Sequence, residues 1–153
     1  MGHCQTKEFG GVDYDESAVV HFPAGLPAFE NERRFLLIEQ AETAPVVFLQ
    51  SLATPQLLFL ALPARFVDPA FRLALLPDER DVLGLAAGEA EPVEGQDLIS
   101  LAILTVRPGA AVTANLLAPV IIGARSRRAL QIVLPDSGYR VDQPLTGAAA
   151  PCS

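Results

Sequence analysis

The sequence predicts an all-β domain: a small antiparallel β-barrel, closed or nearly closed, with one or two short helices. Short apolar or alternating runs recur along the 153 residues, and proline, glycine or aspartate ends each run. No rhythm of strands alternating with long helical patterns is visible, so a parallel sheet is not expected. Half of the residues are hydrophobic, and a chain of this length buries a sizeable core without disulfides. We therefore expect a single domain over residues 1–153, with flexible ends at 1–5 and 147–153.

The expected strands follow one another after short turns. Two lie on either side of an acidic turn at Asp13, Asp15 and Glu16. Pro119 separates two later strands and belongs at an edge or a bulge, because proline cannot donate a ladder hydrogen bond. In chain order, the strands are expected within residues 6–14, 19–22, 35–39, 46–52, 57–62, 71–75, 98–106, 112–116, 120–123 and 129–134.

One short helix is expected after Pro77. Asp78 is the predicted N-cap, and the apolar residues that follow have helical spacing until Gly84 and Gly88 end the pattern. Residues 64–68 lie between two prolines and are expected to form a loop or one helical turn.

The charge restricts the class of partner. The formal net charge is -7, whereas binding to phosphates requires clustered Lys and Arg, so a direct nucleic-acid ligand is not expected. The local basic cluster of Arg125, Arg127 and Arg128 is interpreted as a solvated turn between strands. No apolar stretch approaches the roughly 20 residues that cross a bilayer, so we expect no membrane partner.

Candidate catalytic residues are scarce. The two histidines are His3 and His21, and the two cysteines, Cys4 and Cys152, form no C-x-x-C motif. No phosphate-binding glycine loop or metal-ligand spacing occurs, so we expect no enzyme, no cofactor and no metal. The alternatives are a small-ligand-binding or weakly enzymatic β-barrel domain, because a small barrel can hold a ligand in its mouth, and a purely structural oligomer module.

Residues 19–29 combine a β-branched run with a stiff apolar turn. Pro23 and Pro27 fix two φ angles, while Gly25 permits a positive one. The large side chains of this turn either plug one end of the core or face a partner. We expect Phe22 and Phe29 in the core, and Leu26 on the surface.

Five short motifs occur in register between Thr6 and Leu145. They are Thr6–Gly10, Val20–Phe29, Leu49–Leu52, Asn115–Ile122 and Gln131. Together they resemble the FliW family of flagellar assembly factors. This sequence departs from the family pattern at Ala28, Ala114 and Gly123, where the family commonly has glycine, valine and asparagine.

The resemblance implies a cytoplasmic bacterial protein without catalytic activity. Members of the family bind flagellin before export and, when flagellin is scarce, bind the RNA-binding regulator CsrA. This partner switching relieves repression of flagellin translation by CsrA. FliW docks away from the RNA site and lowers the RNA affinity of CsrA without touching RNA. An acidic domain meeting a basic RNA-binding protein has complementary charge.

The candidate partner-binding residues fall into two groups. The apolar turn offers a rigid anchor, because prolines lower the entropic cost of ordering its side chains. A second group of polar residues lies near the partner surface or, alternatively, caps backbone groups at strand ends and at the Pro119 bulge. The candidates are Phe22, Pro23, Leu26, Pro27, Phe29, Gln50, Ser51 and Asn115. On this interpretation Leu26→Asp abolishes partner binding and leaves the melting temperature unchanged.

Overall fold

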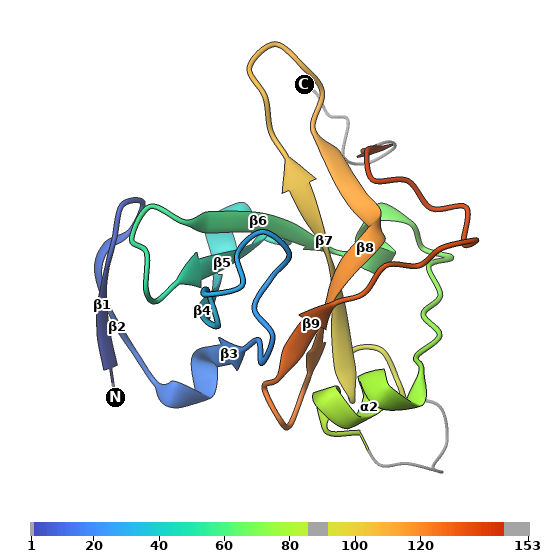
Figure 1. The fold of residues 1–153 in the computed structure, drawn as a ribbon. Helices are drawn as coiled ribbons and strands as arrows, with labels where there is room; N and C mark the ends of the chain where they lie inside the picture. The colour runs from blue at the N-terminus through green and yellow to red at the C-terminus, as the bar shows by residue number, and fades with distance from the viewer. Residues whose placement is uncertain (1, 86–91, 146–153) are drawn as a thin grey trace.

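The computed structural model describes residues 2–85 and 92–145 and consists mainly of antiparallel sheet (Figure 1). Eight strands form one sheet in the order β10-β8-β7-β6-β5-β4-β3, with β9 also paired to β8. Their bounds are β3 Val19–His21, β4 Arg34–Glu39, β5 Val47–Ser51, β6 Leu58–Pro63, β7 Leu98–Thr105, β8 Thr113–Gly123, β9 Ala129–Gln131 and β10 Gln143–Pro144. Two short 3-10 helices, Glu16–Ala18 and Ala41–Thr43, occupy connections between strands.

The sheet nearly closes into a barrel where β3 meets the turn between β8 and β9. The His21 backbone N–H donates to the Arg127 carbonyl oxygen over 2.8 Å, and His21 also pairs with Arg128 as an isolated bridge. The arginine cluster therefore forms a turn between two strands, as expected. The all-β class with a nearly closed barrel is confirmed. The main core cluster consists of Val20, Phe22, Leu26, Phe35, Val47, Leu49, Ala61, Leu101, Val120, Ile122 and Ala129.

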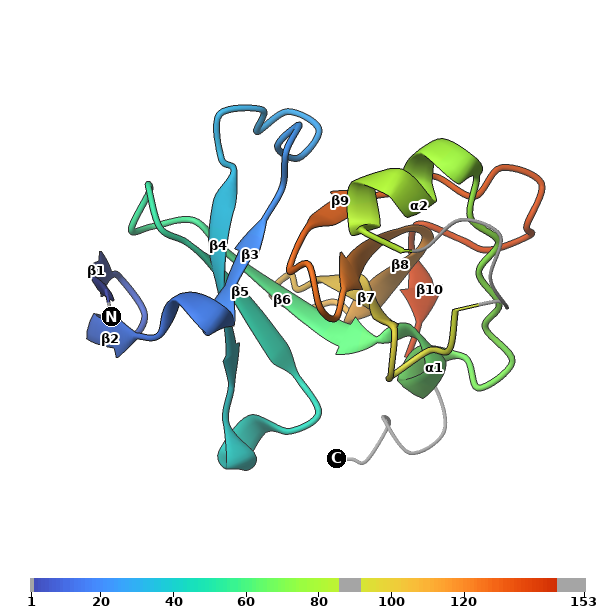
Figure 2. The same cartoon turned by 90° about the horizontal axis from the view of Figure 1, so that it is seen from below.

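Two short α-helices pack beside strands β6–β9, outside the main core cluster (Figure 2). Helix α1, Ala64–Val67, is the single turn expected between the two prolines. Helix α2, Pro77–Leu83, has Leu76 rather than the predicted Asp78 at its N-cap. Glu79 explains the shift, since its carboxylate accepts the Leu76 backbone N–H over 2.7 Å. The helix ends at Gly84, whose φ of 74° is the left-handed C-cap conformation.

Strand β8 is continuous where two strands were expected. Ala102 is the single residue of β7 between the pairs Leu101–Val120 and Ile103–Asn115, whereas β8 has four residues between the same two pairs. The extra residues form a bulge that contains Pro119, so the proline needs no ladder bond. The Asn115 Oδ1 accepts the Ala118 N–H over 2.9 Å, and the Gln131 side chain donates to the Ala118 carbonyl over 2.8 Å. The predicted bulge position of Pro119 is confirmed, but the predicted break in the strand is wrong.

The N-terminal residues form a strand instead of the expected flexible end. Strand β1, Gly2–Thr6, pairs antiparallel along its length with β2, Gly10–Tyr14, and this two-stranded sheet is separate from the barrel sheet (Figure 2). The hairpin packs on the barrel through Phe9, whose ring meets that of Phe48 edge-on at 5.3 Å. Burial of one face of the hairpin orders residues that sequence alone assigned to a flexible end.

The expected strand over residues 71–75 is wrong, because no described segment pairs with it in a ladder. Strand β10, which was not expected, forms two pairs with β8. The expected flexible end at 147–153 lies outside the described residues.

Replacing Asn115 with alanine tests the bulge. Asn115→Ala leaves the partly buried Ala118 N–H without its side-chain acceptor and should lower the free energy of unfolding by about 1 kcal/mol. Chemical denaturation provides the measurement, and Asn31→Ala, at an exposed position, is the matched control. Equal stability of the two variants would contradict the role of Asn115 in the bulge.

Candidate functional site

The connection between β3 and β4 folds back on itself through backbone hydrogen bonds. The Phe29 N–H donates to the Leu26 carbonyl over 2.7 Å, and the Leu26 N–H donates back to the Phe29 carbonyl over 3.3 Å. The Phe22 N–H donates to the Arg33 carbonyl over 2.7 Å, which ties the start of the connection to its end. These bonds hold residues 22–29, called here the 22–29 turn, in one conformation.

The 22–29 turn presents a different side chain from the one expected. Phe22 is fully buried and meets the Phe35 ring edge-on at 5.3 Å, so its predicted core position is confirmed. Leu26 is 5% exposed and belongs to the core, so its predicted surface position is wrong. Phe29 is 39% exposed, although a core position was expected, and one edge of its ring rests on Phe59 at 5.7 Å. Pro23 and Pro27, in the same turn, are exposed.

Left-handed backbone at two positions explains why Leu26 is buried and Phe29 is exposed, the reverse of the expectation. Gly25 has a φ of 70° and Ala28 a φ of 69°, so the chain reverses direction on both sides of Leu26. A Cβ on Gly25 would lie 2.4 Å from the Glu30 carbonyl oxygen, so only glycine fits there. Ala28 tolerates the same conformation at a cost, while its N–H donates to a carboxylate oxygen of Glu30 over 3.1 Å.

Gln50 and Ser51 are buried and hold the turn between β5 and β6. The Gln50 Nε2 lies within hydrogen-bonding distance of four backbone carbonyls, those of Ser51, Thr54, Pro55 and Leu57, at 3.0 to 3.4 Å. The Ser51 Oγ accepts the N–H groups of Ala53 and Thr54 over 3.0 and 2.9 Å. Both side chains bond backbone groups inside the protein, as the alternative interpretation of these residues expected.

Glu32 joins this turn to the end of the β3–β4 connection. Its carboxylate accepts the Ser51 hydroxyl and, over 2.8 Å, the Thr54 hydroxyl. Sequence reasoning missed Glu32, because nothing in its local pattern distinguishes it from other surface carboxylates. The Glu32 carboxylate therefore links the β3–β4 connection, which carries the exposed Phe29, to the turn between β5 and β6.

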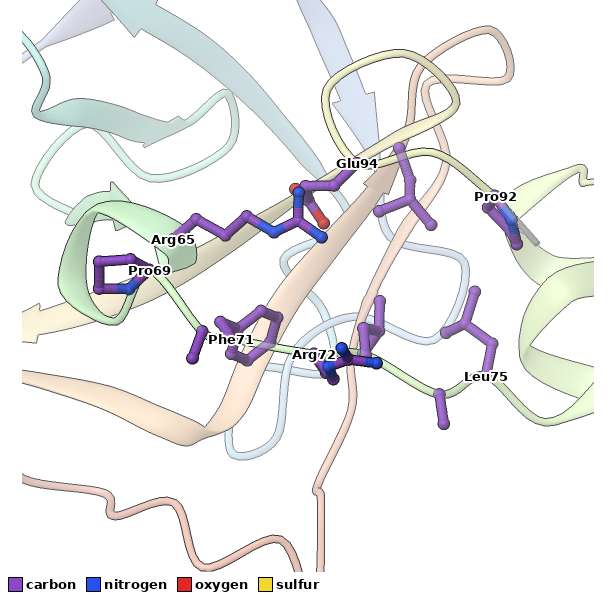
Figure 3. A pocket seen from close by; sticks show the side chains of 11 residues that line it. Arg65, Pro69, Phe71, Arg72, Leu75, Pro92 and Glu94 are labelled. Atoms are coloured by element: carbon purple, nitrogen blue, oxygen red, sulfur yellow. The ribbon is translucent and has the colours of Figure 1, made fainter.

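A cavity of about 760 Å³ lies elsewhere, beside the chain that connects α1 to α2 (Figure 3). Residues 69–75 form one wall, and Arg65, Pro92, Glu94 and Leu98 complete the lining. None of the candidate residues from the sequence lines this cavity. Asn115 lines a second cavity, of about 480 Å³, at the outer end of β7 and β8.

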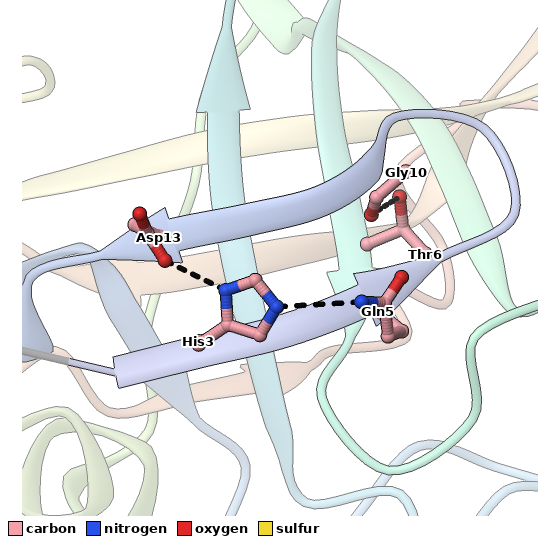
Figure 4. Close-up of polar contacts among 5 residues, drawn as sticks. All are labelled: His3, Gln5, Thr6, Gly10 and Asp13. Atoms are coloured by element: carbon pink, nitrogen blue, oxygen red, sulfur yellow. Dashed lines mark hydrogen bonds and ion pairs between the residues drawn. The ribbon is translucent and has the colours of Figure 1, made fainter.

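The N-terminal hairpin carries a polar chain on its exposed face (Figure 4). The Nδ1 of His3 lies 2.6 Å from a carboxylate oxygen of Asp13, and the Gln5 amide lies 3.4 Å from the Nε2 of the same ring. On the opposite face Cys4 is buried, and burial raises the pKa of its thiol. The thiol therefore stays protonated at neutral pH, which disfavours nucleophilic chemistry.

In the described part of the chain, no group of three or more His, Cys, Asp or Glu side chains is placed to hold a metal ion. None of the described helices has the length and apolar character to span a membrane.

The fold and the 22–29 turn define a class of protein: a nearly closed antiparallel barrel that displays an aromatic side chain on a rigid turn. Comparison with known proteins gives the particular family. The family model described as FliW protein matches residues 3–145. A flagellar assembly factor FliW from Bacillus licheniformis is 37% identical over 148 residues, which cover 95% of this chain and 97% of the relative. The corresponding factor from Bacillus subtilis is 30% identical over 142 residues, or 93% and 95% of the two chains.

A solved structure agrees with this assignment. The crystal structure of a flagellar assembly factor FliW superimposes with a TM-score of 0.81 and 29% sequence identity, and the match covers 97% of this chain and all of the other. The chain belongs to the FliW family of flagellar assembly factors.

Gln50→Glu tests the buried amide. The substitution keeps the size of the side chain but replaces the Nε2 donor with a carboxylate oxygen among four carbonyls, so the free energy of unfolding should fall by about 3 kcal/mol or more. Gln56→Glu, at an exposed position in the same turn, is the control. Urea denaturation compares the two, and a loss below about 1 kcal/mol for Gln50→Glu would contradict the burial and bonding of this side chain.

Ala28→Gly tests the backbone of the 22–29 turn. Glycine adopts a φ of 69° without steric cost, so the variant should unfold at a higher temperature, with a gain of up to about 1 kcal/mol. Ala24→Gly has no positive φ to relieve and should lower stability by about the same amount. Thermal unfolding of both variants provides the measurement, and an Ala28→Gly variant destabilised as much as Ala24→Gly would contradict the strain assigned to Ala28.

Leu26→Asp tests whether the Leu26 side chain lies in the core or on the surface. A carboxylate at this 5% exposed site should lower stability by several kcal/mol, because it buries an unpaired charge. The expected result is a collapse of the melting temperature, opposite to the prediction from the sequence. Pro27→Asp, next along the chain and exposed, provides the comparison.

Proposed function

We propose that this chain is a non-catalytic binding protein of the bacterial cytoplasm that alternates between flagellin and the translational regulator CsrA. When flagellin is scarce, it binds CsrA away from the RNA site and relieves repression of flagellin translation. Membership of the FliW family, over residues 3–145, is the observation that carries this proposal. The charge supports it, because a net charge of -7 favours encounter with a basic RNA-binding protein and disfavours direct RNA contact.

The exposed part of the 22–29 turn is the proposed contact surface. Phe29 offers an aromatic anchor, and the exposed Pro23 and Pro27 belong to the same turn, whose backbone is already ordered before binding. Aromatic anchors on preorganised backbone contribute much of the binding energy in protein interfaces, because little entropy is lost when they dock. Of the other candidates, Phe22 and Leu26 lie in the core beneath the turn, whereas Gln50, Ser51 and Asn115 bond backbone groups inside the protein.

Titration of the purified chain with CsrA tests the proposed function. Isothermal titration calorimetry should give a saturable complex, and added flagellin should displace CsrA. A gel-shift assay should show that the complex has lower affinity for a flagellin leader RNA than CsrA alone. Absence of binding to both proteins would contradict the proposal, and competition between RNA and this chain for one site on CsrA would contradict the proposed mechanism.

Phe29→Ala tests the contact surface. Removal of an interface aromatic should weaken binding to at least one of the two partners by about 2 kcal/mol, or roughly 30-fold. Phe66→Ala is the matched control, because Phe66 is 46% exposed on α1 and lies outside the turn. Circular dichroism checks that both variants keep the fold. Equal affinities of Phe29→Ala and Phe66→Ala for both partners would remove Phe29 from the interface.

A further inference from the structure

The connection from α1 to α2 has the side-chain pattern of a strand but no neighbouring strand. Its residues alternate between inward and outward positions: Phe71, Leu73 and Leu75 are buried or half-buried, whereas Arg72, Ala74 and Leu76 are exposed. This two-residue period is that of an extended chain. The pattern that predicts a strand is therefore present, and only the ladder partner is lacking within the described residues.

The backbone of this segment has a free edge. The Arg72 N–H donates to the Tyr139 hydroxyl over 2.9 Å, and the Leu76 N–H donates to Glu79. In the described part of the chain, the N–H groups of Leu73, Ala74 and Leu75 have no hydrogen-bond partner. Successive N–H groups of an extended chain point to opposite edges, so those of Leu73 and Leu75 point away from Tyr139.

Two arginines, Arg65 and Arg72, and one glutamate line the cavity beside this segment. Neither arginine forms an ion pair with another described residue, and Figure 3 shows Arg65 reaching across toward Glu94. The Glu94 carboxylate already accepts the backbone N–H and the hydroxyl of Ser100, over 2.6 and 2.7 Å. In the described part of the chain neither guanidinium group forms an ion pair, so both remain available to an acidic ligand, in a protein whose overall charge is negative.

We propose that residues 72–75 bind an extended acidic peptide segment of a partner protein by strand addition. The partner backbone would pair with the Leu73 and Leu75 edge, and its carboxylates would meet Arg65 and Arg72. The cavity, at about 760 Å³, falls within the size range of ligand sites and accommodates the partner's side chains over the apolar floor of Phe71 and Leu73. This site shares no residue with the 22–29 turn, and it does not depend on whether CsrA or flagellin binds there.

A synthetic peptide tests the proposal on the full chain. The probe is a fluorescein-labelled, acetylated eight-residue peptide that alternates glutamate and valine, and binding is followed by fluorescence anisotropy. The same peptide with lysine in place of glutamate, and a version with methylated backbone nitrogens, should each bind at least tenfold more weakly. Equal binding of the acidic and lysine peptides would overturn the charge assignment and with it the proposal.

Amide hydrogen exchange locates the contact. Saturation with the acidic peptide should slow exchange at Leu73 and Leu75, because their N–H groups gain acceptors, and should leave the hairpin of β1 and β2 unaffected. Arg65→Ala and Arg72→Ala should each weaken binding about tenfold, with Arg107→Ala, at an exposed position between β7 and β8, as the control. Unchanged exchange at Leu73 and Leu75 under saturating peptide would overturn strand addition.

The result is independent of the titrations with CsrA and flagellin. The peptide assay uses neither CsrA nor flagellin, so peptide binding would still support strand addition if neither protein bound this chain. Conversely, complexes of CsrA or flagellin that are insensitive to Arg65→Ala and Arg72→Ala leave the proposed function intact.

Discussion

Closure of the barrel depends on the contact of β3 with the turn that follows β8. The hydrogen bond from His21 to Arg127 brings the first strand of the sheet to the far side of the core, so that Val20 packs in one cluster with Val120 and Ile122. The β3–β4 connection begins directly after this contact. The position of the 22–29 turn is therefore set by the same backbone bond that closes the sheet.

Most strands could be predicted because their signal is local. Alternating or continuous apolar residues, bounded by turn residues, identified β3 to β7 to within one residue at each end. The continuity of β8 could not be predicted in this way. It depends on Asn115 and Gln131, which satisfy the backbone at Ala118 and allow Pro119 to stay within the strand. These contacts form only after distant parts of the chain have come together.

The sequence predicted which residues form the candidate site better than which of their side chains are buried and which are exposed. The sequence identified a stiff apolar turn and placed Phe22 in the core, as the structure does. It exchanged the roles of Leu26 and Phe29, because the left-handed backbone at Ala28 has no signal in an alanine side chain. The polar candidates Gln50 and Ser51 proved to hold backbone carbonyls and amides inside the protein, where their hydrogen-bonding capacity serves the shape of the neighbouring turn.

The N-terminal hairpin adds a different property to this fold. Strands β1 and β2 pair with each other and contribute no ladder bond to the barrel sheet, so the hairpin can detach without breaking that sheet. A two-stranded hairpin has little stability of its own, and among the described residues this one is joined to the barrel by the Phe9–Phe48 contact and by one backbone bond, from Lys7 to Pro55. Detachment of the hairpin is therefore a local opening that leaves the barrel sheet intact and exposes Phe48 together with Cys4, which lies on the buried face of the hairpin.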